Sequence, residues 1–84
     1  MAVFSCEVYI RPRRDILDPQ GDAVEHALHS LGFTSAGEVR IGRYIRLSVE
    51  AEGEQEARGK LDEMCAKLLA NPVTEDYELK VSRS

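Results

Sequence analysis

The sequence predicts an α+β fold, in which two amphipathic helices cover one face of an antiparallel sheet. Residues 3–10 and 73–81 alternate between apolar and polar side chains, as strands with one covered face do. Two longer segments, 19–31 and 54–70, repeat their apolar residues at helical spacing. The resulting order of strand, helix, strand or hairpin, helix, strand is related to the ferredoxin-like arrangement.

Length and composition narrow the classes of function. The chain has 84 residues, which predicts a single domain spanning 1–84 with a small core unless a partner chain adds to it. With 15 acidic residues against 11 basic ones, nucleic acid is not expected as the main partner. No charged-then-apolar leader and no apolar run of ~20 residues is visible, so a cytoplasmic protein without a membrane segment is expected.

The first strand is expected over residues 3–10 and ends at Pro12, which has no N–H to donate to a sheet. Three arginines, Arg11, Arg13 and Arg14, cluster at this end. Most such clusters are solvated surface. The sharper alternative is a grip on an acidic partner or a phosphate, which guanidinium groups bind well.

The first helix begins at the tetrapeptide Asp18-Pro19-Gln20-Gly21. Asp18 is a favourable N-cap, and Pro19 suits the first helical position because its missing N–H is no loss there. Gly32 ends the helix as a residue that adopts the left-handed conformation without strain. Gly21 is unusual in the first turn, where Ala would favour the helix by roughly 1 kcal/mol. Either the turn tolerates it or something approaches the backbone closely there. The apolar residues expected on one buried face are Val24, Ala27, Leu28 and Leu31.

The middle segment, residues 38–50, allows two interpretations. Its apolar residues share one parity, and only Arg43 breaks the alternation. One interpretation is a hairpin that turns near Gly42 with a bulge. The other is one long strand bent at Gly42, whose far half pairs with another chain in a dimer. Parity alone leaves both open.

The second helix is expected from Glu54 to Ala70 and ends before Asn71-Pro72, because the residue before a proline disfavours the helical region. A last strand follows over residues 73–81, in which Glu75 is the single charge on the apolar face. The expected core stripe of the helix comprises Ala57, Leu61, Met64, Cys65 and Leu68.

No active site is visible in the sequence. His26 and His29 are neighbours on the first helix, but a metal site needs a further ligand, so a polar surface is the better interpretation. Cys6 and Cys65 fall on apolar stripes and are expected to behave as small hydrophobic residues. We therefore expect no catalytic, cofactor-binding or metal-binding residues in this chain.

Four ordered groups of residues give the chain a family resemblance. They are Asp18-Pro19-Gln20-Gly21, residues 27–32, residues 39–44, and residues 67–73 with 75–77. In this order and at these separations they resemble the PurS family, the small subunits of phosphoribosylformylglycinamidine (FGAM) synthase. The departures from the family pattern are a variable loop, 34–37, and extra arginines at Arg11, Arg13, Arg14 and Arg46.

The resemblance implies a non-catalytic subunit in purine biosynthesis. In such a complex a glutaminase subunit releases ammonia, and a large synthetase subunit uses ATP to convert formylglycinamide ribonucleotide to formylglycinamidine ribonucleotide. The small subunit, as a dimer or tetramer, is implied to bridge the two and to assist ammonia transfer. ATP, magnesium and glutamine are then used by the complex, and this chain binds no cofactor. The alternative is a small dimeric regulatory module that binds an amino acid or a nucleotide.

The family resemblance also marks candidate interface residues, at positions where the fold does not obviously demand them. For Asp18, Pro19, Asn71 and Pro72, capping and turn formation explain the residue type at least as well. Replacement of Arg40 or Arg43 by Ala is expected to weaken assembly more than folding. The candidate interface residues are Asp18, Pro19, Gln20, Gly21, Arg40, Gly42, Arg43, Asn71 and Pro72.

Overall fold

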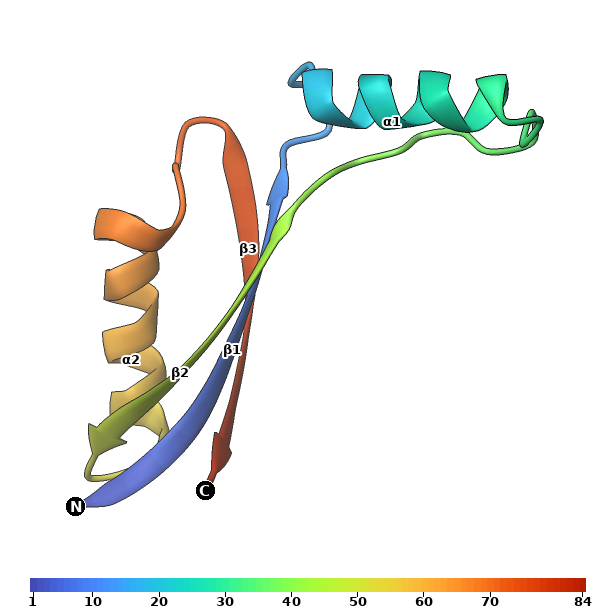
Figure 1. Cartoon of the computed structure of the whole chain (residues 1–84). Helices are drawn as coiled ribbons and strands as arrows, with labels where there is room; N and C mark the ends of the chain where they lie inside the picture. The colour runs from blue at the N-terminus through green and yellow to red at the C-terminus, as the bar shows by residue number, and fades with distance from the viewer.

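Three strands pair in the order β2-β1-β3, each antiparallel to its neighbour, in a computed structural model that describes residues 1–84 (Figure 1). The α+β class and the antiparallel sheet are confirmed. The elements are β1 (Ala2–Pro12), α1 (Pro19–Ser30), β2 (Arg43–Ala51), α2 (Glu54–Met64), a π-helical turn η1 (Cys65–Leu69) and β3 (Glu75–Arg83).

The core lies between the sheet and α2. β1 is the central strand, and its alternation places Phe4, Cys6, Val8 and Ile10 on the face that α2 covers. Their neighbours on β2 and β3 continue this face, as Val8 pairs with Ile45 and Leu79 on either side. The ten buried residues of the core are Phe4, Cys6, Val8, Ile10, Val49, Ala51, Ala57, Leu61, Cys65 and Ala70.

The π-helical turn corrects the predicted core stripe of the second helix. The Ala70 N–H donates to the Cys65 carbonyl (3.0 Å), a five-residue step that puts both residues on the buried face. Leu68 is consequently 82 % exposed, although the helical spacing predicted it in the core. Met64, also predicted in the core, is 37 % exposed; it precedes the turn, at the end of α2. The wider turn, which the spacing alone does not reveal, rotates Leu68 away from the sheet.

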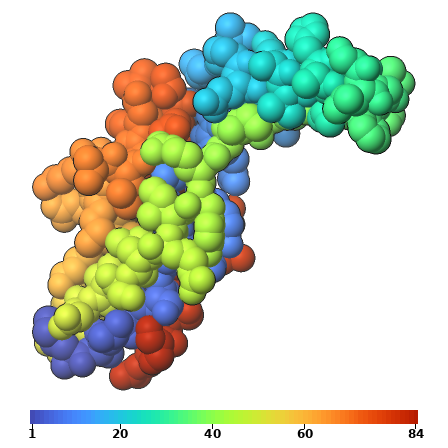
Figure 2. All heavy atoms as spheres, viewed as in Figure 1, coloured from blue at the N-terminus to red at the C-terminus, as the bar shows by residue number.

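The first helix also lies elsewhere than predicted, because only α2 covers the sheet. α1 projects from one end of the sheet, and residues 33–42 run back beside it (Figures 1 and 2). We call residues 13–42 the arm. The stripe that was expected to be buried is largely exposed in this chain, with Val24 at 40 % and Leu31 at 73 %.

The middle segment forms one strand and no hairpin. Residues 38–42 precede β2 without regular secondary structure and without a strand partner in this chain, and the ladder with β1 begins at Arg43. Gly42 lies where the segment crosses the end of β1, and a Cβ there would collide with the Ile10 carbonyl oxygen. The structure therefore excludes the hairpin, and the strand is shorter than the long strand of the other interpretation; pairing of the preceding residues with another chain stays a prediction.

Candidate functional site

The predicted tetrapeptide builds the joint between α1 and the returning segment. The Asp18 carboxylate accepts two backbone hydrogen bonds, from the N–H of Gly21 (3.1 Å) and from the N–H of Ile41 (2.8 Å). The first caps the helix, and the second ties the helix start to residues 38–42. These bonds, with that from Ile41 contributing most, lower the pKa of Asp18.

Gly21 is required by a close approach, and the partner is the chain itself. A Cβ at this position would collide with the carbonyl oxygen of Val39 and would lie 2.8 Å from Oδ2 of Asp18. Gly21 is also the one buried residue of α1. Of the two interpretations of this glycine, the structure favours close approach over tolerance.

Arg40 fastens the same segment to the loop before the helix. Its guanidinium donates to the carbonyl oxygens of Ile16 (2.8 Å) and Arg14 (3.0 Å). Two further polar contacts lie along the helix: Glu25 accepts from the Val39 N–H (3.2 Å), and the His29 ring bonds to the Ala36 carbonyl (2.6 Å). Because a carbonyl oxygen only accepts, Nε2 of His29 carries the proton. Polar contacts thus hold the arm in its fold.

A second cluster closes the end of the core beside η1. Arg43 Nη2 lies 2.7 Å from Oε1 of Glu75 and donates to the Leu69 carbonyl (3.1 Å). The same Glu75 oxygen accepts from the Asn71 N–H (2.8 Å), and Asn71 Oδ1 accepts from the Val73 N–H (3.0 Å). The two charges that interrupt the apolar alternation on β2 and β3 therefore neutralise each other.

Five of the nine candidate interface residues belong to these two clusters. Asp18, Gly21 and Arg40 belong to the first, and Arg43 and Asn71 to the second. Gly42 lies between the clusters at the start of β2. Pro19, Gln20 and Pro72 are exposed. The hydrogen bonds of the clusters explain several of these residue types by folding, and the contact of these residues with partner subunits stays a prediction.

The clusters contain no group suited to covalent chemistry. The two thiols, Cys6 and Cys65, are buried under the sheet face, and burial raises the pKa of both. No group of three or more His, Cys, Asp and Glu side chains is placed to hold a metal ion. No helix has the length and apolar character needed to cross a membrane. The arrangement can position surfaces and bind polar groups.

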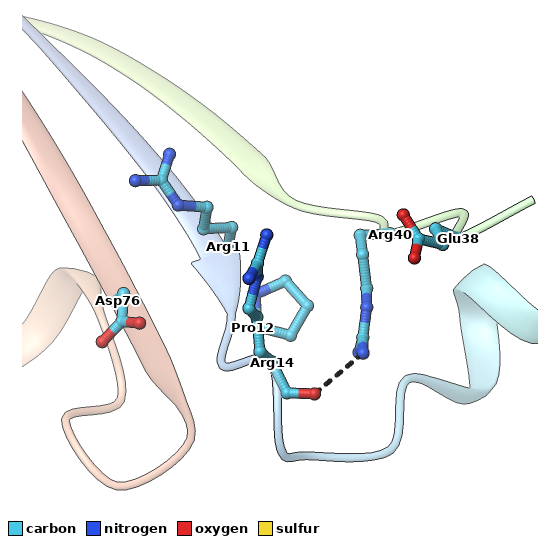
Figure 3. Close-up of a pocket in the computed structure, with 6 residues that line it drawn as sticks. All are labelled: Arg11, Pro12, Arg14, Glu38, Arg40 and Asp76. Carbon is cyan, nitrogen blue, oxygen red and sulfur yellow. Dashed lines mark hydrogen bonds between the residues drawn. The ribbon is translucent and has the colours of Figure 1, made fainter.

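A pocket lies where the sheet meets the arm, and the sequence indicated it only in part. Its volume is about 730 Å³, and it lies between the end of β1, the start of β3 and the arm (Figure 3). The arginine cluster after β1 pointed to it, whereas the contributions of Glu38 and Asp76 depend on the fold. We call it the junction pocket, and its lining residues are Arg11, Pro12, Arg14, Glu38, Arg40 and Asp76.

An exposed apolar surface on the arm is a second feature that the sequence did not reveal. Burial was predicted for Val24 and Leu31 on the first helix, whereas no burial was predicted for Leu17 and Phe33. The exposed fractions in this chain range from 38 % for Ile41 to 74 % for Leu17. We call this the arm surface, and it comprises Leu17, Val24, Leu31, Phe33 and Ile41.

Comparison with known proteins places this fold in one family. The family model described as phosphoribosylformylglycinamidine (FGAM) synthase, PurS, matches residues 5–83. The chain is 43 % identical over 79 residues to the phosphoribosylformylglycinamidine synthase subunit PurS of Bacillus subtilis (94 % of this chain, 93 % of the relative). It is 38 % identical over 81 residues to that of Methanocaldococcus jannaschii (96 % and 98 %). A chain in the structure of PurLQS from Thermotoga maritima superposes with a TM-score of 0.88 at 32 % identity, covering 98 % of this chain and all of that one.

Proposed function

The chain belongs to the PurS family, and we propose from this premise that it couples ammonia production to ammonia use within FGAM synthase. It is a subunit of that synthase in purine biosynthesis, as the match over nearly its whole length shows. Its likeness to a chain of PurLQS is the observation that carries the role in a complex. The partners are then the glutaminase subunit and the large synthetase subunit.

The coupling role agrees with the chemistry of the chain. Its thiols are buried, and its conspicuous residues hold backbone segments in place, so the reaction belongs to the partners. Ammonia released into water is diluted and protonated before it reaches a distant site. A subunit that holds two active sites together raises the effective concentration of the transferred species. We propose that the two clusters at the arm end present the surfaces that do this.

We further propose that the chain works as a homo-oligomer, a dimer or a tetramer, formed through the arm surface. The radius of gyration is 16.4 Å, whereas a compact chain of this length has about 12 Å. An extended shape with an uncovered apolar helix face is typical of a chain that completes its core with a second copy. The unpaired residues 38–42 offer a further edge for pairing between chains.

The coupling role also indicates which subunits use the cofactors of the synthase. We propose that ATP, magnesium and glutamine are used by the other subunits and that this chain binds none of them. We also place the complex in the cytoplasm, because two unpaired cysteines are usual in a reducing compartment.

The test compares glutamine-dependent and ammonia-dependent synthase activity of the two large subunits, with and without this chain. Glutamine-dependent activity is expected to require the chain, while activity with added ammonium chloride largely survives without it. The control is the glutaminase activity alone, which shows whether the active site of the glutaminase subunit is intact. The coupling role is wrong if both activities are the same with and without the chain and if the chain does not co-elute with the partners. The alternative, a regulatory module that binds a small molecule, is then favoured.

A further inference from the structure

The junction pocket combines three guanidinium groups from three separate segments. Arg11 comes from β1, Arg14 from the following loop and Arg40 from the segment that returns along α1. Figure 3 shows Arg14 and Arg40 on either side of Pro12, with Glu38 next to Arg40. Residues more than 25 positions apart in the sequence thus place positive charge around one hollow.

All three arginines keep donors available. The Arg14 side chain makes no hydrogen bond or ion pair within the chain, and Arg11 forms only a long ion pair with Glu78, at 3.7 Å. Arg40 gives one N–H from each terminal nitrogen to the loop carbonyls, which fixes its guanidinium and leaves its other donors free. The pocket is therefore lined by one fixed guanidinium group, Arg40, and two that are less restrained.

The acidic residues at the pocket leave it with excess positive charge. Asp76 lies 3.5 Å from Arg13, an arginine outside the pocket lining, so its charge is already balanced. Glu38 alone then opposes Arg14 and Arg40. Glu38 also has a positive φ of 54°, a conformation that costs a residue other than glycine roughly 1 kcal/mol.

The lining also restricts the chemistry of a ligand. Pro12 is the one apolar residue of the lining, and the other five are charged, so the pocket favours the polar part of a ligand. A carboxylate offers two oxygens, whereas a phosphate monoester offers three on one dianionic group. Three guanidinium groups from different directions match the latter.

We propose that the junction pocket binds the phosphate group of a small phosphorylated metabolite through Arg11, Arg14 and Arg40. The site is additional to the coupling role and does not depend on it. Arg11 belongs to β1, whereas Arg14 and Arg40 belong to the arm, so a bound phosphate bridges the sheet and the arm. Occupancy of the pocket therefore restrains the arm relative to the sheet.

The test is a thermal-shift titration of the full chain with inorganic phosphate and with ribose 5-phosphate, against sodium chloride of equal ionic strength. Both phosphates are expected to raise Tm saturably, because a ligand of the folded state stabilises it by mass action. Arg14→Gln is expected to weaken the apparent affinity about tenfold or more, as loss of a charge-assisted hydrogen bond does. The Arg14 side chain has no partner in the chain, so circular dichroism should show an unchanged fold.

Two further variants sharpen the result. Arg58→Gln removes an exposed charge on α2, far from the pocket, and should leave the titration unchanged. Glu38→Gln removes the opposing carboxylate and should tighten phosphate binding.

The proposal is overturned if sodium chloride reproduces the shift in Tm or if Arg14→Gln binds phosphate like the parent. It is overturned too if glutamate binds as well as phosphate, since the pocket then takes a carboxylate. None of these results depends on glutamine-dependent synthase activity. The proposal of phosphate binding and the proposal of the coupling role can therefore be disproved separately.

Discussion

Two glycines in helices, Gly21 and Gly59, have opposite surroundings. Gly21 lies against the backbone of the returning segment, whereas a Cβ at Gly59 on α2 would have no atom within 4 Å. In both positions glycine is less favourable for a helix than alanine. Only the fold distinguishes them, because the neighbour of Gly21 comes from 18 positions further along the chain.

The same substitution is therefore expected to have opposite effects at the two positions. Gly21→Ala should destabilise the chain by about 1–3 kcal/mol, since the new methyl group collides with a backbone carbonyl that cannot move freely. Gly59→Ala should stabilise it by roughly 1 kcal/mol, the difference in helix propensity. Urea unfolding followed by circular dichroism measures both, and each variant serves as the control for the other. A Gly21→Ala midpoint equal to that of the parent contradicts the close approach.

Arg43 and Glu75 show what sequence reasoning reached and where it stopped. Each was recognised as a charge on an apolar parity, which is a local property of one strand. Their contact depends on the sheet order, because β1 separates the two strands that carry them. The order of strands is set by packing across the whole chain, and the alternation within one strand contains no information about it.

At the scale of the element, the ends of α1 were predictable and its surroundings were not. Asp18 caps the helix as predicted, and Gly32 has φ 99° at its end, where the Phe33 N–H returns to the Leu28 carbonyl (2.9 Å). Capping depends on neighbouring residues, so the sequence alone is sufficient to predict it. Which surface the apolar stripe contacts depends on the path of the chain after Pro12, for which the pattern gives no signal.

The joint held by Asp18 is expected to weaken in acid. The pKa of Asp18 is lower in the folded chain than in the unfolded chain, so its stabilising contribution is present above the unfolded pKa. It is lost as the pH falls through the folded pKa, below the usual carboxyl range. NMR titration of the Gly21 and Ile41 amides should show a shared transition there. Asp18→Asn should abolish that transition, while the amides of α2 stay as in the parent; a transition that persists assigns it to another group.

At the scale of the whole molecule, the chain measures 52 × 26 × 14 Å and buries ten core residues. Its apolar residues divide between the core and the arm surface, which lies beyond the sheet. The sequence predicted how many apolar residues the helices carry. It gave no indication that the stripe of α1 lies outside the chain's own core, because an amphipathic stripe looks the same whichever chain covers it.

The arm surface predicts a self-association that one substitution can weaken. Leu31→Asp should shift the chain towards its 9.4 kDa monomer in sedimentation experiments, because a charge on the covered face opposes burial. Leu68→Asp is the matched control, since Leu68 is at least as exposed but lies on η1 outside the arm surface. Equal sedimentation of the two variants, or a parent that is already monomeric, contradicts an interface at the arm.

The central position of β1 has a consequence for how the chain is made. This strand is synthesised first, yet it pairs with residues 43–51 and then with residues as late as Arg83. Its apolar face therefore emerges from the ribosome long before either neighbour exists, and the sheet cannot close until residues 75–83 have been made. Native contacts of such long sequence separation slow folding, and an unpaired apolar strand is prone to aggregate. The nascent chain is thus most exposed to chaperones and to misfolding while β1 has no partner.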